Sequence, residues 1–306
     1  FFAQLPFVLV GALDAYGRPR ASLVAGPPGF ASSPDQHSLR LDARPAEGDP
    51  IAEGLGLGAP VGLLGIQLET RRRNRMNGIV AAVDERGFRV RVAQSFGNCP
   101  QYIQARDRDA KNGGNGGEQG GGSEGEQGGE NGRENAGGSG GASATPPLRR
   151  EGARLSAAAA ALVGAADTFF IASAAPLARS GKASEGVDVS HRGGKPGFVR
   201  LDLARGGEAT ILTVPDFPGN GAFNTLGNLA LDARAGLLFV DFASGDLLSL
   251  VGEAEIIWEG PELASFARAE RLLRIQIGEG VWLPGAAPRG WSAPRPAPQL
   301  AATGSW

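Results

Sequence analysis

The stretch Asp216–Ile257, DFPGNGAFNTLGNLALDARAGLLFVDFASGDLLSLVGEAEII, joins a polar helix to a hairpin of buried strands. Between Ala222 and Leu231 apolar residues recur at helical spacing, while Asn224, Thr225 and Asn228 share another face. The period then changes to the short apolar run GLLFVDF, a polar turn and a second apolar run. This change predicts a helix followed by two antiparallel strands, with the helix carried on the edge of a sheet. The apolar face of the helix comprises Phe223, Leu226, Leu229 and Ala230.

The same pattern occurs a second time in the chain. Gly62–Arg86, GLLGIQLETRRRNRMNGIVAAVDER, aligns on Gly236–Gly260 without a gap. Upstream of each copy, GRPRASLV from Gly17 matches GKPGFVRL from Gly194. Because the matches keep their order, we interpret them as a tandem repeat of one domain.

The remaining segments predict antiparallel strands with little helix. In the first half, PFVLVGALDA and ASLVAGPPGF form an expected hairpin, and HSLRLDAR and FRVRVAQSF are expected strands. A short helical link is expected at Ile51–Leu57. In the second half, RLSAAAAALVGAAD predicts a helix that Ser156 caps, leading into the strand TFFIASAA.

Length and composition narrow the class of protein. A chain of 306 residues with 42% hydrophobic and 20% charged residues favours about two globular domains. The net charge of -2 provides no general attraction to nucleic acid or membrane. No apolar run reaches the roughly 18 residues of a membrane span. Cys99 is the one cysteine, which excludes an internal disulfide and favours a cytoplasmic location.

The domain boundaries follow from a change of composition. Residues 111–147 are rich in Gly, Glu, Asn, Gln and Ser and cannot form a core, which predicts a flexible linker. The expected domains are therefore 1–110 and 148–306, the second ending in a Pro-rich tail. Because Phe1 opens the chain within the approach to a strand, we expect a piece of a longer polypeptide.

Several motifs resemble those of a known family. DVSHRGGKPGFVRLD, FNTLGNLALDARAGLLFVDF, RRRNRMNGIV and QSFGNCPQYIQ are similar to the pyridoxamine 5'-phosphate oxidase-like, FMN-binding split-barrel proteins in a tandem two-barrel form. The resemblance implies a mainly β fold with minor α, in which two antiparallel split β-barrels are duplicated in one chain. It also implies that FMN lies in the cleft between the barrels.

The function implied by this resemblance is that of a flavoprotein, an FMN-dependent oxidoreductase with an unassigned substrate. Its expected partners are a small-molecule substrate or electron donor and fused or separate reductase domains, and formation of a homodimer stays open. The alternative is a non-catalytic flavin- or haem-binding module, or an interaction domain of a larger redox protein.

The basic run of the first copy is a candidate phosphate site. Alternation along a strand predicts that Arg71, Arg73 and Arg75 share one face. Guanidinium groups donate paired hydrogen bonds to phosphate oxygens and keep their charge. A solvated strand rim is the alternative, and the resemblance favours the phosphate of a flavin. Asn77 on the same strand joins the predicted cofactor-binding residues.

A Gly-rich turn in the second copy brings further donors. Ser190, Arg192 and Lys195 are expected to converge on an anion, although an ordinary hairpin turn has the same composition. Relatives commonly carry Pro where this chain has His191. The match favours binding rather than catalysis.

The helix and the end of the first copy complete the predicted site. Asn224, Thr225 and Asn228 can donate to a phosphate or to the polar edge of an isoalloxazine ring. Simple helix capping by Asn220 or Asn224 is the alternative. Pyridoxamine oxidase proper carries basic residues near this point, so oxidation of pyridoxamine phosphate is not expected. The resemblance places Gln94, Ser95 and Asn98 near the flavin cleft.

The residues offer little for catalysis by the protein itself. His37 and His191 are the two histidines, too few for a histidine metal centre, and neither suggests a Ser-His-Asp triad. We therefore predict no metal, and interpret Cys99 as a small packed residue. A flavin performs its own electron transfer, so no catalytic residue is predicted.

Overall fold

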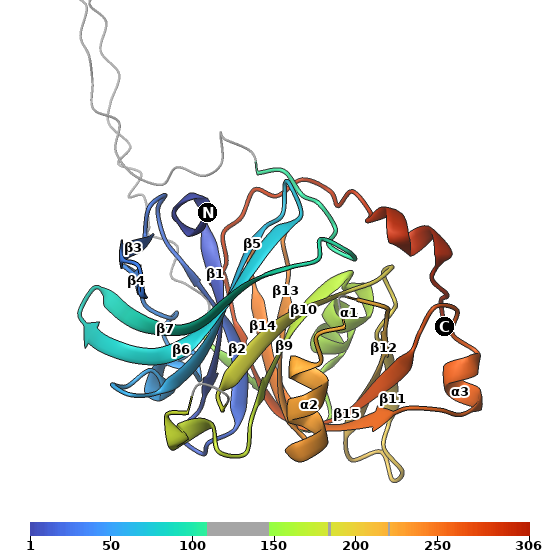
Figure 1. The fold of residues 1–306 in the computed structure, drawn as a ribbon. Coiled ribbons are helices and arrows are strands. Elements are labelled where there is room, and N and C mark those ends of the chain that lie inside the picture. Colours follow the sequence, from blue (N-terminus) through green and yellow to red (C-terminus); the bar gives the residue numbers. More distant parts are fainter. Residues whose placement is uncertain (109–146, 183–184, 220) are drawn as a thin grey trace, which may run out of the picture.

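Two antiparallel sheets, one from each half of the chain, form the fold in this computed structural model, which describes residues 1–108, 147–182, 185–219 and 221–306 (Figure 1). The first sheet comprises β1 (Phe7–Leu13), β2 (Pro19–Ala25), β3 (Ala31–Asp35), β4 (Ser38–Leu41), β5 (Pro60–Gln67), β6 (Arg72–Asp84) and β7 (Gly87–Asn98). The second comprises β8 (Arg149–Glu151), β9 (Thr168–Ala174), β10 (Val187–Gly193), β11 (Arg200–Leu203), β12 (Thr210–Asp216), β13 (Arg234–Val240), β14 (Leu247–Ile257) and β15 (Arg271–Leu283).

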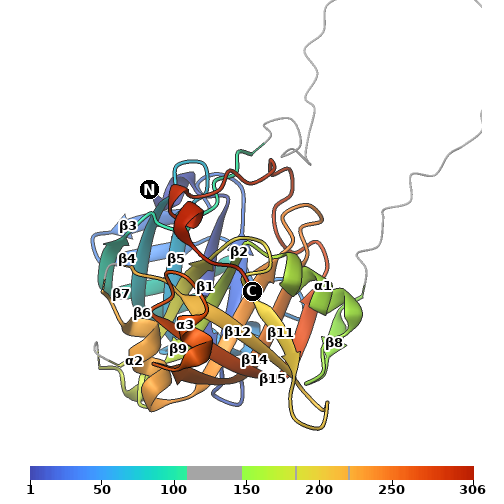
Figure 2. The ribbon, with the colours of Figure 1, turned by 90° about the vertical axis from the view of Figure 1, so that its right-hand side faces the viewer.

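Helices are few and short within the described ranges. The α-helices are α1 (Ala157–Ala165), α2 (Asn224–Leu231) and α3 (Pro261–Ala264), and the 3-10 turns are η1 (Phe2–Gln4), η2 (Ala52–Gly54), η3 (Ala178–Ser180) and η4 (Pro298–Ala302). Figure 2 shows α1 and β8 on one flank of the second sheet and α2 on the other. The predicted mainly β class, with two antiparallel split-barrel-like sheets, is confirmed.

The two sheets have the same topology. The first runs β2-β1-β5-β6-β7-β4-β3 and the second β10-β9-β13-β14-β15-β12-β11, with β8 beside β15. Gly62 pairs with Asn77 and Gly236 with Val251, which is the register that the gapless sequence alignment requires. Both sheets also shift register immediately after these residues, at Asn77/Gly78 and Val251/Gly252. The predicted alignment of the two hairpins therefore holds.

The predicted upstream match is wrong. In the neighbouring-strand register Ser22 pairs with Val10 and Ser190 with Ile171, so β2 is equivalent to β10 rather than to GKPGFVRL, which starts at Gly194 beyond that strand. Hydrogen-bond register, rather than a short Gly- and Pro-containing likeness, fixes which strands correspond.

The repeated glycines bring the halves together. A Cβ on Gly62 would lie 2.6 Å from the carbonyl oxygen of Val187, and one on Gly236 would lie 2.4 Å from that of Pro19. Only glycine allows backbones to approach so closely. One buried cluster, including Leu9, Leu64, Phe170, Ala172 and Leu238, lies between the halves, and each half also has its own core. The edge strands β2 and β10 thus each pack on the other half.

Helix α2 covers part of this junction. It contacts β9, β10 and β14, and Leu226 and Leu229 are buried beneath it. The helix starts at Asn224, after an N-cap at Phe223 that has no side-chain capping bond and is 51% exposed. The predicted start at Ala222 was therefore too early, and Asn224 is not the cap. Asn220 lies outside the described residues.

The sequence also predicted the cap of α1, the linker and the lack of a membrane span. The Ser156 hydroxyl accepts a bond from the Ala159 N–H at 3.3 Å, so the predicted cap of α1 is confirmed. The predicted linker, 111–147, lies outside the described residues apart from Pro147. Among the described residues, no helix has the length and hydropathy needed to cross a membrane.

A buried acid in the β4–β5 connection predicts a pH dependence of stability. The Asp49 carboxylate accepts bonds from the Ser22 hydroxyl and the Ile51 N–H, but burial dominates and raises its pKa to about 6. Because this folded pKa exceeds the unfolded value, the stability it contributes is present below about pH 4 and is lost as pH rises through about 6.

Replacing Asp49 by Asn removes this titration while keeping an acceptor for Ser22. Relative to wild type, the Asp49→Asn variant should gain on the order of 3 kcal/mol of unfolding free energy between pH 4 and pH 7. Urea unfolding of both proteins across that range measures the difference. Parallel pH profiles would contradict the assignment.

Candidate functional site

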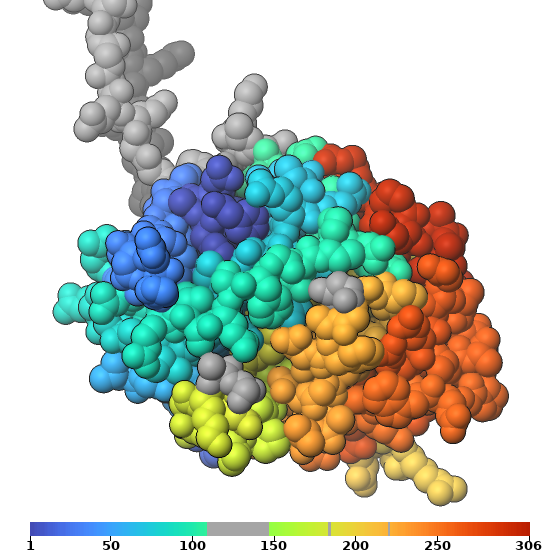
Figure 3. Space-filling view, viewed as in Figure 1, coloured from blue at the N-terminus to red at the C-terminus, as the bar shows by residue number. Residues whose placement is uncertain are grey.

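A cavity of about 300 Å³ lies where the first half meets α2 and the loop after β12. Strand β6 supplies Arg73 and Arg75, while β10 supplies Ser190, His191 and Arg192. In the space-filling view, the teal surface of the first half borders the orange surface around α2 (Figure 3). Both halves of the chain therefore contribute to one site.

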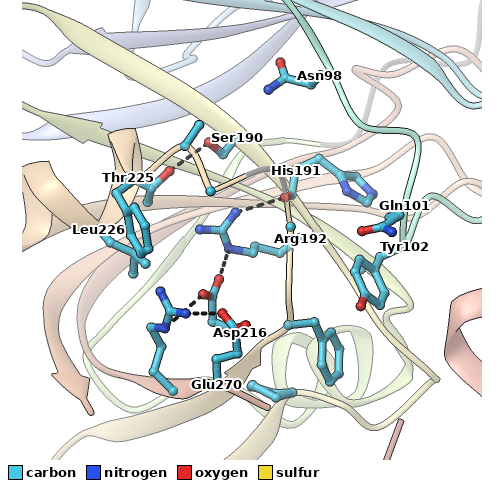
Figure 4. Close-up of a pocket in the computed structure, with 18 of the residues that line it drawn as sticks. Asn98, Gln101, Tyr102, Ser190, His191, Arg192, Asp216, Thr225, Leu226 and Glu270 are labelled. Carbon is cyan, nitrogen blue, oxygen red and sulfur yellow. Dashed lines mark hydrogen bonds and ion pairs between the residues drawn. The ribbon is translucent and has the colours of Figure 1, made fainter. Parts of the chain in front are cut away.

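Four arginines line this cavity, and carboxylates match them only in part. Arg192 lies 3.5 Å and Arg271 3.6 Å from the Asp216 carboxylate, and Arg271 also pairs with Glu270 (Figure 4). Arg75 Nη1 donates to both carboxylate oxygens of Asp188 at 3.1 and 3.2 Å. The fourth arginine, Arg73, donates to the backbone oxygen of Cys99 at 2.7 Å.

The pKa values of Arg73 and Arg75 are lowered where these cations lie close together. Burial, and then the charge of Arg75, lowers the pKa of Arg73 to about 10. Burial also lowers the pKa of Arg75, which Asp188 opposes and Arg192 reinforces. With a pKa of about 10, Arg73 remains positive at neutral pH. A bound anion would relieve the mutual repulsion of these arginines.

A buried hydrogen-bonded cluster crosses the junction at the floor of the cavity. Arg75 Nη2 donates to Ser190 Oγ at 2.6 Å. Figure 4 shows the contact of Ser190 Oγ with Thr225 Oγ1, which lies 2.7 Å away. Asp188, Ser190 and Thr225 are each 4% exposed or less. The cluster ties β6 of the first half to β10 and α2 of the second, and it orders three donor groups beside the cavity.

His191 is neutral in this setting. Its side chain is 4% exposed, and burial followed by the charges of Arg73, Arg192 and Arg106 lowers its pKa well below the usual range. Its backbone oxygen accepts a bond from Arg192 at 3.2 Å. The imidazole therefore offers a neutral ring rather than a fifth cation.

Aromatic residues close the other wall of the cavity. Tyr102 and Phe217 stack with ring centroids 5.0 Å apart, and Arg271 lies 5.1 Å over the Phe223 ring. Sequence reasoning did not select these residues, nor Gln101, Asp216 or Glu270. The proximity of CPQY to the QSFGN turn and of DFPG to the helix was the available signal, but only the tertiary fold brings these loops together.

A second cavity of about 400 Å³ continues along the same junction, with Phe223 lining both. Four carboxamide side chains line it: Asn77, Gln94, Asn224 and Asn228. Asn228 Nδ2 donates to Ser173 Oγ at 3.1 Å. Asp188, which accepts from Arg75, also lines this second cavity.

Several buried polar atoms on these walls have no hydrogen-bond partner. They are Arg75 Nε, Asn77 Oδ1, Asn98 Oδ1 and His191 Nε2. Such atoms are rare in folded proteins because each costs desolvation energy. These atoms supply donors and acceptors with which a polar ligand can bond.

The predicted residues divide between the two cavities, with three exceptions. Arg73, Arg75, Asn98, Ser190, Arg192 and Thr225 line the first, and Asn77, Gln94, Asn224 and Asn228 line the second.

The three exceptions have other contacts. Arg71 does not share the face of Arg73 and Arg75, because it precedes β6 with a φ of 58° and donates to the Ile103 backbone oxygen. Lys195 Nζ donates to the Thr303 oxygen at 2.7 Å, and Ser95 Oγ lies 3.4 Å from Asn74 Oδ1 in an exposed position. None of the three lines either cavity.

No protein-family model and no curated protein matches the sequence. Among solved structures, a HupZ variant from Group A Streptococcus aligns over 40% of this chain and 93% of its own, with 14% identity and a TM-score of 0.30. HutZ, the heme storage protein from Vibrio cholerae, aligns over 43% and 96%, with 13% identity and a TM-score of 0.28. Likeness at this level assigns no ligand to this chain.

Proposed function

We propose that this chain binds FMN across the two cavities and serves as an FMN-dependent oxidoreductase. The observation that carries the proposal is the convergence of Arg73, Arg75 and Arg192 on a cavity in which their charges are only partly matched. Ser190 and Thr225 add hydroxyl donors at the same place. A phosphate monoester carries the charge and the acceptor oxygens that this set requires.

The amide-lined cavity suits the rest of the cofactor. An isoalloxazine ring presents alternating donors and acceptors along its pyrimidine edge, which Asn77, Gln94, Asn224 and Asn228 can pair. The unpartnered acceptors Asn77 Oδ1 and Asn98 Oδ1 match the N–H and hydroxyl groups of a flavin. Together the two cavities fall within the range of volumes typical of cofactor sites.

In this proposal the flavin supplies the hydride or electron transfer, and the protein binds and orients it. The arginines hold the phosphate, and neutral His191 keeps an uncharged ring beside them. The aromatic pair Tyr102–Phe217 shields one wall from water. The substrate and the electron donor are further partners of the same cleft.

A binding titration tests the cofactor assignment. Apo-protein should bind FMN at least ten-fold more tightly than riboflavin, since only FMN carries the phosphate that the arginines contact. Flavin fluorescence quenching measures both affinities under the same conditions. Equal affinities for FMN and riboflavin would contradict the proposed phosphate site.

Visible absorption of the purified chain separates the remaining alternatives. A flavin spectrum that NADH or NADPH bleaches under anaerobic conditions supports an oxidoreductase. A flavin spectrum that neither donor nor a panel of small substrates changes favours a binding module. A Soret band would instead identify haem as the ligand.

A further inference from the structure

The cleft described above has a counterpart built from the opposite halves. Because the sheets share one topology and register, β14 takes the place of β6, β2 that of β10, and the β4–β5 connection that of the segment containing α2. The register then pairs individual residues. Leu247 corresponds to Arg73, Ser249 to Arg75, Arg20 to Asp188, Ser22 to Ser190 and Val24 to Arg192.

The contacts confirm that these positions are equivalent in space. Ser249 Oγ donates to the Ala21 oxygen on β2, just as Arg75 reaches Ser190 on β10. Ser22 donates to Asp49 in the β4–β5 connection, as Ser190 bonds to Thr225 in α2. The same framework therefore surrounds both clefts, and only the side chains differ.

Those differences replace three arginines that line the candidate site. The three arginines of the candidate site are replaced by Leu247, Ser249 and Val24, each 1% exposed or less. In place of the Thr225 hydroxyl stands the carboxyl group of Asp49, which is 3% exposed. An anion at these positions would meet a buried acid and none of the three equivalent guanidinium groups.

A partly exposed ion-pair cluster lies at this counterpart. Arg20, which is 2% exposed, donates to Asp14 Oδ2 at 3.1 Å and to Glu279 Oε1 at 2.5 Å. Arg18 Nη2 lies 2.9 Å from the same two carboxylates. Two cations thus face two anions, although Arg20 Nη1 keeps no hydrogen-bond partner.

The pKa values of Asp14 and Glu279 are consistent with this pairing of two cations with two anions. Burial alone would raise the pKa of Asp14 and of Glu279, but bonds from Arg18 and Arg20 outweigh it and lower both. Glu279, which pairs with Arg18 and Arg20, lies where Gln94, a predicted cofactor-binding residue of the amide-lined cavity, lies in the other half.

We propose that the counterpart cleft is a structural ion-pair clamp that takes no ligand, so the chain has one phosphate-binding cleft rather than two. The identity of the ligand rests on the proposed function. The clamp itself rests on the Arg18–Asp14–Arg20–Glu279 contacts and the loss of the three arginines.

Two measurements on the full chain test this proposal. Equilibrium dialysis at saturating FMN should give one FMN per chain, for wild type and for the Glu279→Gln variant. The same Glu279→Gln variant should lower Tm by roughly 3 to 8 °C, because Arg20 loses a partner. Glu255→Gln is the matched control, since Glu255 pairs with Arg274 at 3.2 Å in an exposed position; its Tm should stay near wild type.

The outcomes separate the clamp from the cofactor assignment. Two FMN per chain overturns the single-cleft proposal while leaving FMN binding in place. If wild type binds no FMN, the proposed function fails, and the Tm comparison decides the clamp. A Tm for Glu279→Gln equal to that of Glu255→Gln overturns the clamp, and a selective fall supports it.

Discussion

Replacing Arg75 by Gln should lower the free energy of unfolding by about 3–5 kcal/mol at neutral pH, since the change leaves Asp188 charged, buried and unpaired. Asp188 is 2% exposed, and both of its carboxylate oxygens accept from Arg75 Nη1. Chemical denaturation at pH 7 measures the loss. The Arg75–Asp188 contact joins β6 of one half to β10 of the other. The lost free energy of unfolding therefore measures how much this contact stabilises the junction between the halves.

A companion variant identifies the cause. Arg75→Gln combined with Asp188→Asn removes the unpaired charge and should recover most of the lost stability. A double variant as unstable as the single one would show that packing around Arg75, rather than the charge of Asp188, is responsible.

The double variant Arg73→Gln/Arg192→Gln should weaken FMN binding by 100-fold or more. Each charge-assisted hydrogen bond to a phosphate contributes on the order of 1.5 to 3 kcal/mol, so the loss of two exceeds the roughly 2.7 kcal/mol that corresponds to 100-fold. Riboflavin affinity should change little, because riboflavin lacks the phosphate. Fluorescence titration of both ligands provides the comparison.

The control for this experiment is Arg72→Gln on the same strand. Arg72 lies 5.5 Å over the Phe1 ring and does not line either cavity, so its loss removes a positive charge without removing a ligand contact. Its FMN affinity should remain within about two-fold of wild type at moderate salt. A comparable loss in this control would point to the overall charge instead of the cavity.

The sequence by itself predicted the hairpin and the duplication. Its signal was local: the period of apolar residues in GLLFVDF and LLSLVGEAEII identifies two strands, and the gapless match to Gly62–Arg86 carries the same register into the other half. It also selected Arg73, Arg75, Ser190, Arg192 and Thr225, since these donor types cluster in short segments. Local patterns are readable because neighbouring residues in a strand or turn share one geometry.

Only the tertiary structure decided which of these residues meet. Arg71 leaves the strand face through its positive φ, and Lys195 turns toward Thr303, although spacing placed both with the other donors. Tyr102, Phe217 and Arg271 come from loops and strands far apart in the chain. Their approach depends on how two sheets dock through Gly62 and Gly236, which no local period encodes.

The candidate site and its counterpart differ in their side chains, and the tertiary structure was needed to recognise this difference. The gapless repeat in the sequence already aligns Arg73 with Leu247 and Arg75 with Ser249. Arg192, however, corresponds to Val24 only when the strand register is known. The misplaced match of GKPGFVRL hid this correspondence. Side chains from β2, β14 and β15 assemble the counterpart, so its charge is a property of strand packing and not of any single segment.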